Sequence, residues 1–202
     1  MKIEYFHASK YGNGAMVAQE FKTIMGAENG EVNVQHIRDA HPKAMPPADL
    51  YVFSSPGRMG KPIGGMRRFL KNVRLPAGAE YAILTTEAAP KPDKKTGKMP
   101  TPEEIAKWQR VRPIMNELLA PKNLEKVAES CVFVTGLKGP LEEGWQKKVK
   151  DFASLVSSAS WRSTSSRLLW LKDRGSLNTS GAVRGSSSRD RQERALPVLK
   201  DR

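Results

Sequence analysis

The N-terminal segment of this 202-residue chain constrains its fold more than any other part. A short strand-like run leads into the loop His7–Gly14, and a helical pattern follows at once to about Met25. The first turn of a helix has backbone N–H groups without partners, and the helix dipole adds about half a positive charge there. Gly12 lets the backbone approach an anion closely, and Ser9 offers a hydroxyl donor. The segment therefore predicts a strand, an anion-binding loop and a helix in succession.

The next part of the chain continues the alternation of strands and helices as far as residue 156. The predicted strands cover residues 2–6, 32–37, 50–53, 81–85 and 132–135, and the predicted helices cover residues 12–25, 65–73, 101–120 and 141–155. The third helix has the clearest start, because Thr101 and Glu104 form a capping box around Pro102. Short strands alternating with helices form parallel sheets with right-handed crossovers. We therefore predict an α/β three-layer sandwich with a five-stranded parallel sheet.

The composition changes near Leu155, which divides the chain into a domain at 1–156 and a tail at 157–202. The tail is rich in serine and holds ten Lys and Arg against four Asp and Glu, so it carries +6 of the chain's formal charge of +13. It contains too few apolar residues to offset the entropy of ordering it. We predict that this basic Ser/Arg-rich tail is disordered. Two origins stay open, namely an evolved tail and a remnant of cloning or of a frame shift.

Several classes of protein are excluded by what the sequence lacks. The single cysteine, Cys131, rules out an internal disulfide and a cysteine-based zinc cage, and its apolar neighbours indicate a small packing residue. The histidines His7, His36 and His41 do not have the spacing of metal ligands, and we assign no catalytic residue. The sequence has no signal peptide and no apolar stretch of the roughly 18 residues that a membrane span requires. We expect a cytoplasmic protein.

Parallel α/β sheets bind their ligands at the carboxyl ends of the strands, at the point where the strand order reverses. Three loops at that edge have the small and hydroxyl-bearing residues suited to a flat, phosphorylated ligand. They follow the first, third and fourth predicted strands. The candidate binding residues are Ser9, Lys10, Tyr11, Gly12, Asn13, Gly14, Pro56, Gly57, Arg58, Met59, Gly60, Thr85, Thr86, Glu87 and Ala88.

These loops resemble those of the flavodoxin family over roughly residues 1–156. Ser9–Asn13 resembles the family's loop for the FMN phosphate, and Ser54–Gly60 resembles the loop that lies along the isoalloxazine ring. The Thr85–Thr86 stretch is similar to the loop on the other side of the ring. The resemblance implies a sheet order of 2-1-3-4-5 and bound FMN. A dinucleotide fingerprint is absent from the sequence, so we expect FMN rather than FAD.

The sequence departs from the family pattern in three respects. Gly14 stands where the family usually has a hydroxyl residue, and neither ring loop contains Trp or Tyr. Met59 or Arg58 would then cover the ring and Tyr11 would approach its edge, with less aromatic stacking than is usual. The first 156 residues carry a formal charge of +7, whereas flavodoxins that shuttle electrons are usually acidic. A related branch, the protoporphyrinogen-oxidase type, has a similar Ser-Lys-Tyr-Gly loop and an arginine after strand three, the position of Arg58.

The resemblance supports three functions of different classes. The leading hypothesis is an FMN-binding redox protein that transfers electrons to or from a partner protein. The alternatives are an FMN-dependent oxidoreductase acting on a quinone or porphyrinogen, and a flavodoxin-like interaction module without flavin. Basic residues lack the interleaved aromatics of a base-stacking surface, so nucleic acid is not favoured as a partner.

Basic residues also gather in the loops expected at the site. Lys10, Arg58, Lys61 and the insertion Lys91–Lys98 would together give the site a positive rim. The insertion has two interpretations, a solvated loop and a flap that engages an acidic partner or an anionic substrate. We therefore expect an acidic redox partner.

Overall fold

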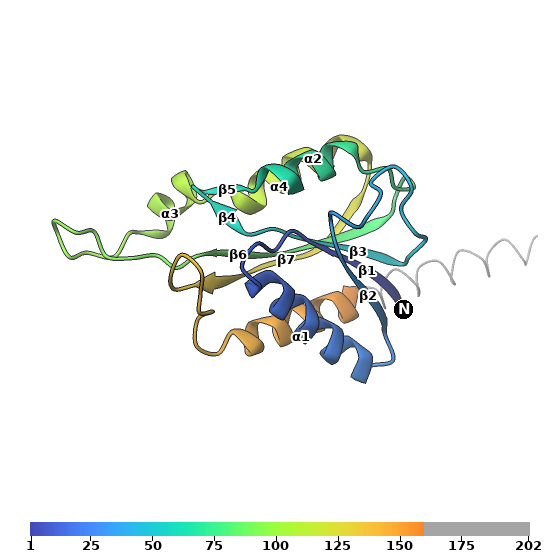
Figure 1. Cartoon of the computed structure of the whole chain (residues 1–202), viewed down its shortest axis with the longest axis horizontal. Helices are drawn as coiled ribbons and strands as arrows, with labels where there is room; N and C mark the ends of the chain where they lie inside the picture. Colours follow the sequence, from blue (N-terminus) through green and yellow to red (C-terminus); the bar gives the residue numbers. More distant parts are fainter. Residues whose placement is uncertain (160–202) are drawn as a thin grey trace, which may run out of the picture. The chain divides into compact units, whose positions relative to one another are not determined.

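The structure is a computed structural model, and it describes residues 1–159. Its centre is a five-stranded sheet in the order β2-β1-β3-β6-β7, in which all neighbours run parallel (Figure 1). The strands are β1 (Lys2–His7), β2 (Glu31–His36), β3 (Leu50–Ser54), β6 (Glu80–Ala88) and β7 (Glu125–Val134). A small antiparallel hairpin of β4 (Gly57–Arg58) and β5 (Lys61–Pro62) follows β3. The predicted order, 2-1-3-4-5 along the main sheet, is confirmed.

Helices cover both faces of the sheet (Figure 1). They are α1 (Asn13–Ala27), α2 (Gly64–Asn72), α3 (Pro102–Trp108), α4 (Val111–Leu119), the short 3₁₀ turn η1 (Ala120–Lys122) and a helix over residues 145–159. Alternate side chains of a strand point to opposite faces, so Tyr5 packs with α1 and the 145–159 helix, while Phe6 packs with α2 and α4. The result is the predicted three-layer α/β sandwich.

The prediction of one helix over residues 101–120 is wrong, because the segment forms α3 and α4 with a break at Gln109 and Arg110. The start is as expected: the Glu104 N–H donates to the Thr101 hydroxyl, and the Thr101 N–H donates to the Glu104 carboxylate. The break follows from Pro113, which has no N–H and whose ring clashes with the carbonyl four residues earlier in a continuous helix. Ending α3 before Gln109 places Pro113 in the first turn of α4, where no such bond is required.

The last two strands of the main sheet are longer than predicted. β6 continues to Ala88 and pairs with β7 along its whole length, from Glu80 opposite Glu125 to Ala88 opposite Val134. The first half of β7 is polar, so it carries no apolar signal. Because β6 is extended, Glu87 and Ala88 belong to the sheet rather than to the loop that follows it.

The chain continues beyond the predicted domain boundary at residue 156 as part of an ordered helix. That helix begins at residue 145 rather than 141 and extends to residue 159. The Ser157 hydroxyl donates to the Glu28 carboxylate over 2.7 Å. The rest of the predicted tail, residues 160–202, lies outside the described residues.

Within residues 1–159, no helix has both the length and the apolar character needed to cross a bilayer.

Candidate functional site

A pocket of about 450 Å³ opens at the carboxyl edge of the sheet, where the loops after β1, β3, β6 and β7 meet. Its lining residues are Ser9, Lys10, Tyr11, Asn13, Gly14, Pro56, Gly57, Arg58, Ile63, Thr86, Glu87, Ala88, Val134, Gly136 and Leu137. The three predicted loops therefore come together around one cavity. Of the predicted residues, Gly12, Met59, Gly60 and Thr85 do not line it.

The start of α1 forms one end of the pocket. Gly12 precedes the helix with a φ of 92°, a left-handed conformation that favours glycine, and no side chain caps the helix. The first turn contains no acidic residue, so its outward-facing N–H groups keep their partial positive charge. A Cβ on Gly14 would lie 3.3 Å from the Ser9 Cβ, which leaves little room for the hydroxyl residue usual in the flavodoxin family. Ser9 therefore stands against the first turn of α1, where its hydroxyl adds a donor to the backbone N–H groups.

The loop after β7 contributes a wall that the sequence analysis did not assign. The Asn13 amide donates to the carbonyl of Lys138 over 3.1 Å, which holds this loop against the start of α1. Gly136 and Leu137 thereby reach the pocket, and Leu137 is largely exposed at its mouth. The topology placed this loop at the correct edge of the sheet, but its residues carry no pattern that indicates a ligand. The contact that brings them in joins residues far apart in the sequence.

The β4–β5 hairpin forms another wall of the pocket and packs against the junction between α3 and α4. A Cβ on Gly60 would lie 1.7 Å from the Trp108 carbonyl oxygen, and the Arg110 N–H donates to the Gly60 carbonyl over 2.7 Å. Gly60 thus permits a close approach of two backbones rather than a contact with the pocket. Met59, at the tip of the hairpin, is 92 % exposed and does not line the pocket.

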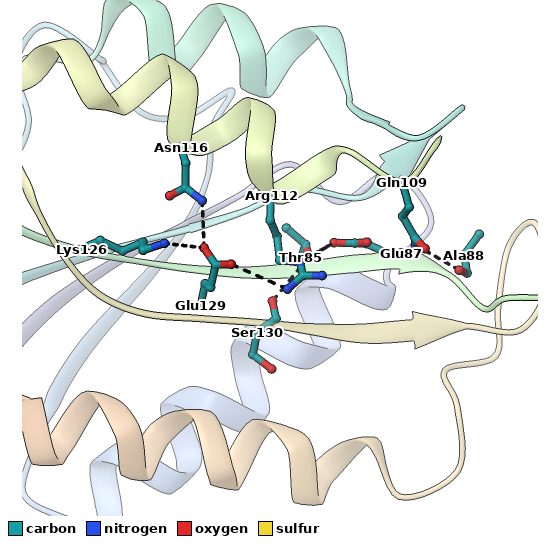
Figure 2. Close-up of polar contacts among 9 residues, drawn as sticks. All are labelled: Thr85, Glu87, Ala88, Gln109, Arg112, Asn116, Lys126, Glu129 and Ser130. Carbon is teal, nitrogen blue, oxygen red and sulfur yellow. Dashed lines mark hydrogen bonds and ion pairs between the residues drawn. The ribbon is translucent and has the colours of Figure 1, made fainter. Parts of the chain in front are cut away.

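A polar network fixes the β6 wall from the α4 side of the sheet. Figure 2 shows the Glu87 carboxylate, which is 1 % exposed, accepting from the Thr85 hydroxyl at 2.6 Å and from the Arg112 guanidinium at 3.1 Å. A second Arg112 nitrogen lies 3.8 Å from Glu129, which also accepts from Asn116. Thr85 therefore belongs to the hydrogen-bond network on the α4 side of β6 rather than to the lining of the pocket.

The α3–α4 junction holds the end of β6 as well. The Gln109 side-chain N–H donates over 3.1 Å to the carbonyl of Ala88, the last residue of β6 that lines the pocket (Figure 2). Gln109 is buried, and its side-chain oxygen has no partner within the described residues. The break that Pro113 imposes is what turns Gln109 toward the sheet, so the wall of the pocket depends on that break.

Cys131 lies beside this network and is half-buried rather than fully buried. Burial, together with the negative charge of Glu87, raises the pKa of the Cys131 thiol. The thiol is therefore protonated at neutral pH and a poor nucleophile. No group of three or more His, Cys, Asp or Glu side chains within residues 1–159 is arranged to hold a metal ion.

His7 ends β1 just before the anion-binding loop. Its ring contacts His36 edge-on at a centroid distance of 5.1 Å, and its Nδ1 accepts a long hydrogen bond of 3.4 Å from the Ser9 N–H. Burial lowers the pKa of His7 and the charge of His36 lowers it further, while Asp39 opposes them. The folded protein therefore favours neutral His7 beside the loop.

This preference predicts an acid-sensitive contribution to stability. Because the folded pKa lies below the unfolded value of 6.5, His7 has no effect on stability at higher pH and destabilises the folded state as the pH falls below 6.5. We expect His7→Gln to flatten the fall in urea midpoint between about pH 7.5 and pH 5. The exposed His41 provides the control, since His41→Gln should leave the slope unchanged. An unchanged slope in the His7 variant would contradict this assignment.

Comparison with known proteins shows the fold. No protein-family model and no curated protein matches the sequence. Among solved structures, Flavodoxin 2 from Bacillus cereus is 20% identical with a TM-score of 0.59, and the match covers 78% of this chain and 99% of that one. A flavodoxin from Streptococcus pneumonia TIGR4 is 15% identical with a TM-score of 0.56, covering 78% and 99%.

A larger enzyme matches over part of its length. The rubredoxin oxygen:oxidoreductase of Desulfovibrio gigas is 13% identical with a TM-score of 0.58, and the match covers 80% of this chain. The chain spans only 36% of that enzyme. Together these likenesses show that the chain has a flavodoxin-like fold.

Proposed function

We propose that this protein binds FMN and transfers electrons to or from a partner protein. The observation that carries the proposal is the junction of Ser9 with the uncapped start of α1, which opens on a 450 Å³ pocket formed by four loops. An uncapped helix start with no acidic residue in its first turn suits a phosphate, and the remaining walls suit a flat ring. The flavodoxin-like fold of the chain supports the same ligand.

Each part of the pocket would have its own task in holding FMN. Ser9–Gly14 would hold the phosphate, while Pro56–Arg58 and Thr86–Ala88 would lie on either side of the ring. Tyr11 is the aromatic residue of the wall, and it is 47% exposed, so we expect little stacking on the ring. When bound, the flavin supplies the redox chemistry, while the chain supplies binding, orientation and the surrounding charge.

The positive charge around the pocket favours an anionic ligand. It also favours an acidic partner protein, as expected from the sequence. Lys10 and Arg58 line the pocket as exposed cations, whereas the charge of Glu87 is balanced by Arg112 behind the wall. The positive side of the site therefore attracts the phosphate and any acidic protein that approaches it.

The experiment that tests this function uses FMN-loaded protein reduced without oxygen. We expect it to pass electrons to small acceptor proteins and to show no sustained turnover of a quinone or a porphyrinogen. Sustained turnover of either compound would replace the carrier function with that of an oxidoreductase. A protein that takes up no flavin would contradict both.

A further inference from the structure

The segment between β6 and α3 forms a basic arm, defined here as residues 90–100. Figure 1 shows it extending beyond the carboxyl end of β6. Every residue from 91 to 99 is exposed, and none of the arm lines the pocket. The arm is therefore not a wall of the binding site, which leaves open the two interpretations given above, a solvated loop and a flap that engages an acidic partner or an anionic substrate.

The arm contains a turn that is closed by several hydrogen bonds. The Asp93 carboxylate accepts from the backbone N–H groups of Lys95 and Thr96 and from the Thr96 hydroxyl, at 2.8 to 3.1 Å. Backbone hydrogen bonds from Asp93 to Lys98 and from Gly97 to Asp93 close the turn. These N–H donors, Thr96 first, hold the pKa of Asp93 below its ordinary value, so the carboxylate stays charged and engaged. An ordered turn loses less entropy on binding than a flexible loop would.

The lysines of this turn have no ion-pair partner in the part of the chain that the structure describes. Lys91, Lys94, Lys95 and Lys98 are exposed, and none of their ammonium groups makes an ion pair within residues 1–159. Asp93 is the one acidic residue of the arm, which leaves a formal charge of +3 over 90–100. Exposed like charges on one turn repel each other, and an anionic surface relieves that repulsion.

Exposed apolar side chains lie at the end of the arm, at the end of α3 and on the β4–β5 hairpin. Met99 is 57% exposed at the end of the arm, and Trp108 is 45% exposed at the end of α3. The backbone of Trp108 lies against Gly60, so the 92% exposed Met59 lies on a hairpin next to α3. Tryptophan and methionine are enriched in the contact surfaces between proteins.

The β6 end of the arm is fixed to the pocket wall. The Ala89 N–H donates to the Val134 carbonyl over 2.9 Å, and the Gln109 side chain, which follows α3, donates to the Ala88 carbonyl over 3.1 Å. Arg110 ties the same junction to the hairpin. A protein held by the arm would therefore sit at the mouth of the pocket.

We propose that the basic arm, together with Met59, Met99 and Trp108, is the docking surface for an acidic redox protein. The inference rests on the proposed function, because it identifies the class of protein that exchanges electrons at this pocket. Charge attracts the partner over long range, and the exposed apolar side chains then hold it in contact. A single-stranded nucleic acid is not favoured as the partner, because its bases stack on aromatic side chains placed between the basic residues, and residues 90–100 contain no aromatic residue.

The test uses the full chain and two probes of opposite charge. The acidic probe is a plant-type ferredoxin, and the basic probe is cytochrome c. In the arm variant, Lys91, Lys94, Lys95 and Lys98 are changed to Gln. The control variant changes Lys22, Lys43, Lys71 and Lys150, which are equally exposed and do not line the pocket. Both variants lose four charges and keep the ten Lys and Arg of residues 160–202.

We expect the arm variant to associate with ferredoxin about 10-fold more slowly than the parent at low salt, with the control variant near the parent. Added salt should remove the difference, because exposed charges are screened beyond about 10 Å at 0.1 M. The association of cytochrome c with the arm variant should be no slower than with the parent. The proposal would be overturned if the arm and control variants lost the same fraction of the rate of association with ferredoxin. It would also be overturned if the association rate of the parent did not change with salt. Tighter binding to a single-stranded oligonucleotide than to ferredoxin would also overturn it.

Two further readouts separate this proposal from the proposed function. FMN affinity is measured for each variant and should be the same, because the arm does not line the pocket. Binding of ferredoxin to flavin-free protein is measured directly. Loss of flavin binding with intact docking would overturn the function alone, whereas intact flavin binding without arm-dependent docking would overturn the docking surface alone.

Discussion

Replacing Arg112 with methionine is expected to destabilise the protein by about 2 to 4 kcal/mol, because it leaves the Glu87 carboxylate buried without its counter-charge. Glu87 is 1% exposed and would keep only the Thr85 hydroxyl as a partner. Arg112 itself is 33% exposed, so solvent screens part of the interaction and the lower half of that range is favoured. Urea denaturation monitored by circular dichroism measures the loss.

Two variants control this prediction. Arg110, which directly precedes α4, pairs with Glu117 of that helix, but both side chains are at least half exposed, so Arg110→Met should cost less than about 1 kcal/mol. In the double variant Glu87→Gln with Arg112→Met, no charge is buried, and part of the stability should return. Equal effects of Arg110→Met and Arg112→Met would show that the network around Glu87 contributes no more than a surface ion pair.

Ser9→Asp is expected to weaken FMN binding by about 2 to 3 kcal/mol, or roughly 30- to 160-fold in Kd, through repulsion between the new carboxylate and the phosphate. The change also removes a hydroxyl donor at the start of α1. Ser9→Ala, which removes only that donor, should weaken binding by a smaller factor, about 5- to 10-fold. Quenching of FMN fluorescence on titration measures both.

The matched control is Ser154→Asp on the 145–159 helix, where the side chain is exposed and does not line the pocket. It adds the same charge and should leave Kd unchanged. If Ser9→Asp and Ser154→Asp bind FMN equally well, the phosphate does not bind at the start of α1.

The elements that could be predicted from sequence are those with strong local signals. The apolar strands β1 and β3, and the glycine-rich entry to α1, are defined by residues adjacent in the chain. The capping box of α3 is equally local. Their parallel arrangement then follows from general rules of α/β sheets, which is why three of the four pocket loops could be predicted.

The remaining features depend on contacts between distant residues. Asn13 and Lys138, which bring the loop after β7 to the pocket, are 125 residues apart. Glu87 and Arg112 are brought together only after the helix breaks at Gln109, and Pro113 is the one local signal of that break. The polar half of β7 is stabilised by its pairing with β6 rather than by its own composition.

The most direct test of the account compares FMN with riboflavin, which has the same ring but no phosphate, in equilibrium titrations of the flavin-free protein. We expect one FMN per chain and riboflavin binding at least about 100-fold weaker, because a phosphate at a helix start is held by charge-assisted hydrogen bonds. The Ser9→Asp variant should lose most of this preference. Equal affinities for the two compounds, or no binding of either, would contradict the claim that the pocket is an FMN site.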